Sequence, residues 1–302
     1  MTVQRQTISY LARRFREVGF EPVSRHGQNF LIDMNLQGLI VEAAQLEPTD
    51  VVLEVGTGTG ALTALMAPRV AAVVTVEIDD RLFQMAAEEL VDCPNVTMLS
   101  FDVLKNKNRL DPRVMEAIGQ SLSGAPDRQL KLVANLPYSV ATPVISNLLS
   151  AEHVPRGMIV TVQKELADRL GAQPGTKDYG ALSVWVQCQC RVELVRILAP
   201  SVFWPRPKVE SAIVRIDMDE GRRSRLPNRE AFHDFVRSLF LHRRKLLRGV
   251  LVAAYKDRLS KAEVDQALAK LGFATDQRAE QLEVGQMLAL HAAIALQLQT
   301  HA

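Results

Sequence analysis

The chain has 302 residues, 47% of them hydrophobic, which is enough to bury a large core without disulfides. Cys93, Cys188 and Cys190 form no C-x-x-C pair and are odd in number, so we expect reduced thiols, a cytoplasmic location and no zinc site. No apolar run approaches the ~18 residues that cross a bilayer, and no apolar signal-peptide core is present at the N-terminus. We therefore expect a soluble protein without a membrane segment or a bound metal.

The first twenty residues are rich in Arg and poor in acidic residues, a composition that mitochondrial transit peptides share. Ile8, Leu11, Phe15 and Val18 nevertheless fit one stripe of a helix, and Gly19 would end it. We favour a surface helix that belongs to the fold.

From about residue 35 onward, short β-branched runs alternate with helical patterns, which indicates a parallel sheet wrapped by helices. After a helix near 163–171 come two longer extended stretches joined by a Pro-rich connection. Because no crossover helix separates these stretches, we expect an antiparallel hairpin at one sheet edge. The expected strands are 51–55, 72–77, 96–99, 130–134 and 158–162, and the extended stretches are 184–197 and 209–216.

The run from Asp219 to Pro227 is polar and contains Gly and Pro, so a domain boundary is expected there. Residues 1–222 would form an α/β domain with an N-terminal helical extension, and residues 223–302 a small helical domain. The net charge is +2, but residues 201–260 contain fourteen Lys and Arg against seven Asp and Glu. This stretch is thus +7 and the remainder −5, which indicates a polyanionic partner.

A glycine-rich turn, Glu54-Val-Gly56-Thr-Gly58-Thr-Gly60, follows the first strand and opens a helix, so the backbone can approach a ligand closely. Glu77 ends the second strand, where a carboxylate can accept both hydroxyls of a ribose. Asp102 follows the third strand, where it can face an adenine ring. Together these features indicate an adenosine-containing ligand at the carboxyl edge of the sheet.

The same turn also satisfies the relaxed dinucleotide fingerprint, as Gly56-x-Gly58-x-x-Ala61 with Glu77 near the expected distance. An NAD-dependent oxidoreductase is therefore an alternative. Such an enzyme should carry a hydride-transfer partner in its second half, and the sequence offers no convincing one.

After the fourth strand the chain reads Asn135-Leu136-Pro137-Tyr138. An adenine amine is a weak nucleophile because its lone pair is delocalised into the ring. The Asn135 side-chain oxygen and a neighbouring backbone carbonyl can accept both N–H groups and so direct the lone pair at an electrophile, while Pro137 stiffens the turn. Tyr138 offers a face for base stacking, a contact worth ~1 to 3 kcal/mol. The electrophile would be the sulfonium methyl of S-adenosylmethionine, so positioning carries most of the catalysis.

With these motifs, the sequence resembles the ribosomal RNA small-subunit adenine dimethyltransferase family over nearly the whole chain. The segment Gly27-Gln28-Asn29-Phe30-Leu31 is similar to the family's opening cofactor motif, and the glycine turn, Glu77, Asp102 and the Asn135 loop follow in the family's order. Further similar segments are Gln163-Lys164-Glu165 with Arg169, Tyr179-Gly180 and Phe203-x-Pro205-x-Pro207-Lys208-Val209-Glu210-Ser211.

The resemblance implies a Rossmann-like class I methyltransferase domain, with a mostly parallel seven-stranded sheet and an antiparallel edge hairpin, plus a small C-terminal helical domain. It implies a monomer that dimethylates the N6 amines of two adjacent adenosines in small-subunit ribosomal RNA, or in an immature small subunit, during ribosome biogenesis. The expected catalytic residues are Asn135, Leu136, Pro137, Tyr138 and Phe203, the last as a second aromatic wall for the extruded base. The expected cofactor-binding residues are Gln28, Asn29, Leu31, Glu54, Gly56, Gly58, Gly60, Glu77, Asp102 and Asn135.

The chain departs from its relatives beside both expected pockets. Thr57 and Thr59 stand where relatives often have Pro and Leu, and Trp204 and Arg206 where they often have Thr and Pro. These departures bear on fine substrate preference rather than on the reaction.

A basic segment in the +7 stretch follows a predicted core stripe of Phe232, Phe235, Val236 and Leu239. A charge run is often only a solvated helix face, but this one lies where a phosphate backbone would have to pass, and the family carries a similar motif. We expect its side chains to contact RNA, with binding that weakens as salt rises. The expected contact residues are Arg243, Arg244, Lys245 and Arg248.

Two further alternatives remain open. Large-subunit ribosomal RNA adenine N6-methyltransferases share the cofactor and Asn-loop motifs, but the basic segment and the Phe203 to Ser211 segment favour the small-subunit enzymes. An RNA-binding assembly or transcription factor could keep the fold without turnover, and the intact Asn135 to Tyr138 loop argues against this.

Overall fold

The computed structural model describes residues 7–22, 28–226 and 228–299. Gly27 of the expected cofactor motif and Pro227 of the expected boundary lie outside the described residues. Across these three ranges, no helix is both long and apolar enough to cross a bilayer.

The chain divides into two compact units. The first comprises the chain up to Ala167 together with Val192–Met218, and the second comprises Asp168–Arg191 together with the chain from Asp219 onward. The second unit thus resumes close to the expected boundary at residue 222. It differs from the expected helical domain because it also contains Asp168–Arg191.

Long-range contacts explain why this internal segment belongs to the second unit. The hydroxyl of Tyr179 donates to the carbonyl of Leu282 at 2.8 Å. The ring of Trp185 lies 4.4 Å from the imidazole of His233. These contacts join positions about 50 to 100 residues apart, so no local sequence pattern indicates them.

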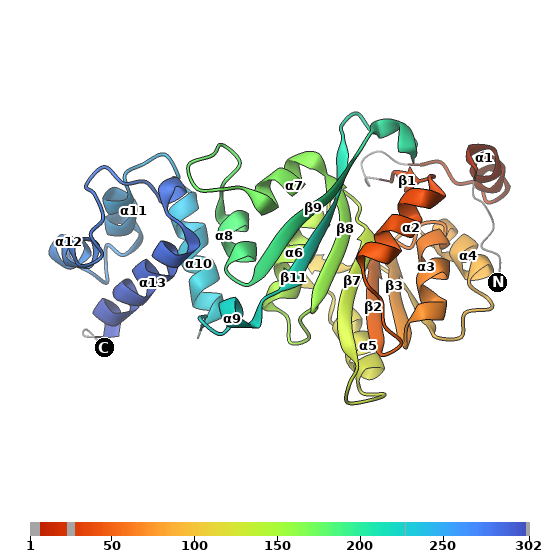
Figure 1. The fold of residues 1–302 in the computed structure, drawn as a ribbon, viewed down its shortest axis with the longest axis horizontal. Helices are drawn as coiled ribbons and strands as arrows, with labels where there is room; N and C mark the ends of the chain where they lie inside the picture. Colours follow the sequence, from red (N-terminus) through yellow and green to blue (C-terminus); the bar gives the residue numbers. More distant parts are fainter. Residues whose placement is uncertain (1–6, 23–27, 227, 300–302) are drawn as a thin grey trace. The chain divides into compact units, whose positions relative to one another are not determined.

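A seven-stranded sheet with the order β4-β3-β2-β7-β8-β11-β9 forms the centre of the first unit (Figure 1). β2, β3, β4, β7 and β8 pair in parallel, and β11 pairs antiparallel with β8, as expected for a mostly parallel sheet with an antiparallel edge. The strands are β2 (Asp50–Val55), β3 (Ala72–Glu77), β4 (Val96–Ser100), β7 (Gln129–Asn135), β8 (Gly157–Gln163), β9 (Cys190–Leu198) and β11 (Ser211–Met218).

The central strands are buried on both faces, which explains their continuous β-branched runs. α2 and α3 pack against one face of the sheet, in front of β2 and β3 in Figure 1. α5 packs on β2, β3 and β7. The helices of this unit are α1 (Ile8–Glu17), α2 (Met34–Ala43), α3 (Ala61–Met66), α4 (Asp80–Glu89), α5 (Pro112–Leu122) and α6 (Ala141–Ser150), with 3-10 turns η2 (Ala67–Arg69) and η3 (Pro200–Val202).

The prediction of an extended stretch at 184–197 is wrong for the first part of this range. Residues Ala181–Gln187 form the helix α8, and β9 begins only at Cys190. Val184, Trp185 and Val186 are all buried, and a short apolar run of this kind fits a buried helix as well as a strand.

Two pairs of very short strands escaped the sequence analysis. β1 (Phe30–Leu31) pairs antiparallel with β10 (Phe203–Trp204), and β5 (Leu104–Asn106) pairs with β6 (Arg109–Leu110). The β1–β10 ladder brings the start of the chain against the Pro-rich connection.

Apart from the first two residues of β9, the regular elements among the described residues of the second unit are helices. The predicted core stripe is confirmed, because Phe232, Phe235, Val236 and Leu239 are all buried on α10. Its elements are α8, α9 (Glu220–Arg223), α10 (Arg229–Phe240), α11 (Leu247–Ala254), α12 (Lys261–Lys270), η4 (Ala279–Gln281) and α13 (Val284–Gln299), while α7 (Lys164–Gly171) begins in the first unit and ends in the second.

Candidate active site

A cavity of about 310 Å³ opens at the carboxyl ends of β2, β3 and β7 in the first unit. This volume lies within the ~300 to 1,000 Å³ range of small-molecule and cofactor sites. Its lining includes most of the expected ligand-binding residues, namely Gln28, Asn29, Gly56, Gly58, Glu77, Asp102, Asn135 and Pro137.

The glycine loop after β2 directly contacts the loop that follows β7. Gly56 has φ +83°, and a Cβ added there would lie 3.0 Å from Cγ of Pro137. Only glycine takes this conformation freely and leaves room for the proline ring. The turn therefore lets the loops of β2 and β7 meet at the cavity.

Glu77 is positioned by backbone donors from the loops that follow β2 and β3. Its carboxylate accepts from the N–H groups of Gly58 (2.9 Å), Ile78 (3.0 Å) and Asp79 (3.1 Å). Burial raises the pKa of Glu77, and these three hydrogen bonds oppose the rise. Oε1 accepts two of these bonds and Oε2 only the one from Gly58, so Oε2 keeps acceptor capacity for a further donor such as a sugar hydroxyl.

Asn135 ends β7, and its carboxamide has a fixed orientation. Its Nδ2 donates to the backbone carbonyl of Asn29 at 3.0 Å. Because a carbonyl can only accept, this bond assigns the amide nitrogen and leaves Oδ1 as the acceptor for another group. Pro137, two residues later, lines the same cavity.

Among the other expected catalytic residues, Leu136, Tyr138 and Phe203 lie differently. Leu136 is buried, and its N–H donates to the carbonyl of Thr161 at 3.1 Å. The hydroxyl of Tyr138 lies 2.6 Å from Oγ of Ser211, and the ring is partly buried. Phe203 is only 2% exposed and packs in the main core cluster. None of these three residues is among the described residues that line the cavity.

Three expected cofactor residues support the cavity from behind instead of lining it. Leu31 is buried and pairs with Phe203 in the β1–β10 ladder. Gly60 is the N-cap of α3 with φ +77°, and a Cβ there would contact Leu90 and Ala86. The third, Glu54, is the acceptor at the centre of a buried polar network.

The Glu54 network holds the glycine loop to β3. Oε2 of Glu54 accepts from the hydroxyls of Thr63 (2.5 Å) and Thr75 (2.9 Å), and the hydroxyls of Thr75 and Thr57 lie 2.6 Å apart. A hydroxyl has one proton, so Thr75 donates to Glu54 and Thr57 donates to Thr75. Burial raises the pKa of Glu54 to about 8, more than these hydrogen bonds lower it, and the Glu77 carboxylate contributes to the rise.

Sequence reasoning missed the apolar half of the cavity wall. Ile78 directly follows Glu77 and is 53% exposed, and Phe101 and Val103 flank Asp102. The sequence could have indicated these lining residues, because they are adjacent to the expected polar residues and residues next to a strand end belong to the same loop. The lining residues that the analysis missed are Phe30, Val55, Val76, Ile78, Leu82, Phe101, Val103, Ser139 and Val140.

The four expected RNA-contacting residues differ in their surroundings within the second unit. Arg243 donates to the carbonyls of Lys177 (2.9 Å) and Tyr179 (3.5 Å), so it anchors a neighbouring loop. Arg248 forms a bidentate ion pair with Asp265, at 2.5 and 2.9 Å. Two side chains, Arg244 and Lys245, are exposed in the turn between α10 and α11.

Among the described residues, no group of three or more His, Cys, Asp or Glu side chains is placed to hold a metal ion. Cys188 and Cys190 are buried free thiols of the second unit, and Cys93 is partly buried.

The strand order and the cavity at the carboxyl edge define a Rossmann-like class I methyltransferase fold. A profile described as Ribosomal RNA adenine dimethylase matches residues 20–296, nearly the whole chain. The chain belongs to the ribosomal RNA adenine dimethylase family.

Similar proteins agree with this assignment. The chain is 39% identical to a protein of Halothermothrix orenii named Ribosomal RNA small subunit methyltransferase A, over 87% of this chain and 85% of that one. It is 38% identical to a protein of the same name from Geobacillus thermodenitrificans, over 91% and 92%. The NAD-dependent alternative is set aside by family membership.

Two solved structures have the same fold. A dimethyladenosine transferase from Plasmodium falciparum superposes with a TM-score of 0.71 at 24% identity, over 88% of this chain and 97% of that chain. A structure titled 23S rRNA methyltransferase ErmE superposes with a TM-score of 0.61 at 25% identity, over 88% and 100%. The first comparison supports the fold alone, because its sequence identity is low.

Proposed function

We propose that this protein transfers methyl groups from S-adenosylmethionine to the N6 amine of adenosines in small-subunit ribosomal RNA, dimethylating two adjacent adenosines during ribosome biogenesis. The observation that carries the proposal is Asn135, whose Nδ2 is held by the Asn29 carbonyl at the wall of the cavity. An amide fixed in this way presents Oδ1 to an incoming amine.

The residues of the cavity suit S-adenosylmethionine. Glu77 would accept the ribose hydroxyls, and Asp102 would accept from the adenine amine, between the apolar side chains of Phe101 and Val103. The positive-φ turns at Gly56 and Gly58 leave the backbone open to the ligand. When bound, the cofactor would supply a sulfonium methyl group, whose transfer releases a neutral thioether that needs no acid assistance to leave.

The chain's own part in the reaction is to orient the target amine. Oδ1 of Asn135 and the backbone carbonyl of Leu136 would accept its two N–H groups, so that the nitrogen lone pair faces the methyl carbon. The target base would stack on Tyr138, whose hydroxyl is held near Ser211. Phe203 would have to be uncovered before a base could contact its ring, because it is buried in the core cluster.

The second unit would hold the RNA mainly through Arg244 and Lys245, since Arg243 and Arg248 already bind groups of the protein. Their phosphate contacts would be electrostatic and salt-sensitive. The partner would be small-subunit ribosomal RNA or an immature small subunit, and the protein would act as a cytoplasmic monomer without a metal.

The test combines a substrate comparison with one variant. Purified small and large ribosomal particles are incubated with labelled S-adenosylmethionine, and label is expected in N6,N6-dimethyladenosine of the small particle. Asn135→Ala should keep cofactor binding and lose at least ~100-fold in methyl transfer, as for a lost positioning contact. Asn147→Ala, on α6 and outside the cavity lining, is the control.

Label confined to the large particle would favour the large-subunit methyltransferases that also match the fold. Absence of methyl transfer despite cofactor and RNA binding would favour a non-catalytic assembly or transcription factor. Full activity of Asn135→Ala would remove Asn135 from the mechanism.

A further inference from the structure

The N-terminal helix α1 packs into an aromatic cluster beside the cavity. Leu11 and Phe15 of α1, together with Phe20, are buried against Leu82 and Met85 of α4. Tyr10, Val18, Phe30, Ile32 and Trp204 pack around this group. Leu11, Phe15 and Val18 of the stripe that the sequence analysis predicted therefore meet residues of β1, α4 and β10, whereas the fourth member, Ile8, is exposed.

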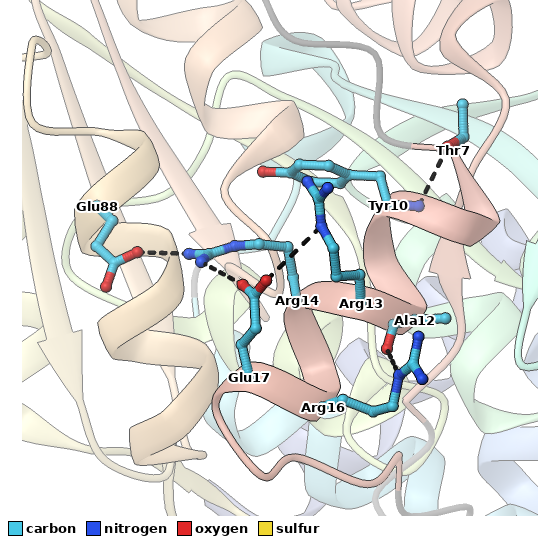
Figure 2. A network of polar contacts seen from close by, with 8 residues as sticks. All are labelled: Thr7, Tyr10, Ala12, Arg13, Arg14, Arg16, Glu17 and Glu88. Carbon is cyan, nitrogen blue, oxygen red and sulfur yellow. Dashed lines mark hydrogen bonds and ion pairs between the residues drawn. The ribbon is translucent and has the colours of Figure 1, made fainter.

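Polar contacts hold α1 at this place, as Figure 2 shows. The helix begins with the Thr7 hydroxyl accepting from the N–H of Tyr10 at 3.2 Å. The guanidinium of Arg14 bridges Glu17, at 3.0 Å, and Glu88 of α4. Arg81, also of α4, donates to the carbonyl of Gly19, just after the helix. The helix is thus tied to α4 at two points.

Phe30 connects the aromatic cluster to the cavity. Its ring lies 5.1 Å from that of Phe15 and 6.2 Å from that of Phe20, between ring centroids. The same side chain lines the cavity, and a Cβ added at Gly58 would lie 3.4 Å from its ring. Phe30 therefore forms cavity wall on one side and contacts α1 on the other.

Trp204 completes the support of this ring. Its indole stacks on Phe15, with 5.3 Å between centroids and 26° between planes. It is also the register partner of Phe30 in the β1–β10 ladder. Phe15 and Trp204 thus hold the position of Phe30 from the helix and from the paired strand.

We propose that Phe15 and Trp204 are positioning residues for the cofactor, which hold Phe30 as a preformed part of the binding wall. The inference rests on the proposed function, because it takes the cavity to be the S-adenosylmethionine site. A wall that is already ordered costs less conformational entropy on binding, so loss of this support weakens affinity. It leaves turnover nearly unchanged once the site is saturated, since the bound cofactor then orders Phe30 itself.

The test compares four variants by calorimetric titration with S-adenosylmethionine and by steady-state methylation. Phe15→Leu and Trp204→Leu should each raise the Kd and KM for S-adenosylmethionine about 3- to 10-fold, as for loss of one aromatic pair, with kcat within about 2-fold. Trp204→Phe, which keeps an aromatic stack, should restore most of the affinity. Ile8→Ala, on the same helix but exposed and outside the cluster, should bind as the wild type does.

Tryptophan emission supplies a readout that a purely structural role would not change. The chain has two tryptophans, and Trp185 lies in the second unit, so Trp185→Phe leaves Trp204 as the reporter. Because the wall is preformed, S-adenosylmethionine should leave the Trp204 emission maximum of this variant unchanged. In Phe15→Leu on the same background, it should shift the emission towards that of the unsubstituted helix, because the bound cofactor then orders Phe30. If Trp204→Leu does not fold, Phe15→Leu and the emission titration still decide the question.

Wild-type binding is measured first, which separates the two ways of failing. No binding of S-adenosylmethionine to the wild type refutes the proposed function together with this inference. If the wild type binds S-adenosylmethionine and the Kd is unchanged in Phe15→Leu and Trp204→Leu, the inference alone is refuted.

Discussion

Replacing Glu54 by glutamine tests whether a neutral carboxyl lies under the glycine loop. Burial raises its pKa from 4.5 to about 8, so the folded protein binds this proton more tightly than the unfolded chain does. The resulting stability is fully present below about pH 4.5 and is lost as the pH rises through about 8. At about 1.4 kcal/mol for each pH unit between the two pKa values, the loss totals about 4 to 5 kcal/mol.

Glutamine removes the titration but keeps the network. Its amide oxygen can accept from Thr63 and Thr75 as Oε2 of Glu54 does. The free energy of unfolding of Glu54→Gln, relative to the parent, should therefore rise by about 4 kcal/mol between pH 5 and pH 8.5. Below pH 5 the two proteins should differ little.

Urea denaturation at several pH values provides the measurement. In a Trp185→Phe background, Trp204 emission follows unfolding of the first unit alone. Subtracting the parent's free energy of unfolding at each pH cancels the contributions of titrating groups that both proteins share. Glu152→Gln, at an exposed carboxylate, is the matched control substitution. Parallel stability curves for Glu54→Gln and its parent would mean that Glu54 ionises as it does in water, and the explanation based on burial would be wrong.

Two further substitutions test the close approach at the cavity and the basic turn. Gly56→Ala should lower stability by about 1 to 2 kcal/mol and weaken S-adenosylmethionine binding at least ~10-fold in calorimetry, because φ is +83° and a Cβ would lie 3.0 Å from Pro137. Gly38→Ala, a helical position with nothing within 4 Å of the added Cβ, should bind normally, and normal binding by both would contradict this account. Arg244→Ala should reduce the slope of log binding constant against log salt by about 1 for a small-subunit RNA fragment, and Arg248→Ala by less, because Asp265 already pairs with Arg248. Equal slopes for these two variants would show that the ion pair does not limit RNA contact.

The polar part of the site could be predicted because it depends on a local rule. Glu77, Asp102 and Asn135 each end or follow a buried strand, and parallel strands bring their carboxyl ends to one edge. The composition of each strand identified it independently. The positions of these three residues at the cavity could therefore be predicted without knowledge of distant contacts. The glycine turn was predictable for the same reason.

The remainder depends on pairings between distant parts of the chain. β1 and β10 are two-residue strands separated by about 170 positions, too short to leave a periodic pattern. The ion pair of Arg248 with Asp265 and the hydrogen bonds of Arg243 likewise join separate elements. The sequence alone therefore predicted four equivalent basic side chains. In the structure, two of them, Arg243 and Arg248, already bind other groups of the protein.

The four residues that the sequence analysis named as departures from the family motifs do not line the cavity. Thr57 is buried in the network below the glycine loop, and Trp204 stacks on Phe15 outside the lining. Thr59 faces a separate small cavity beside α1, and Arg206 is exposed. Among the described residues, the groups that line the cavity include none of these four. We therefore expect substitutions at Thr57 and Trp204 to affect cofactor affinity before they affect the reaction catalysed.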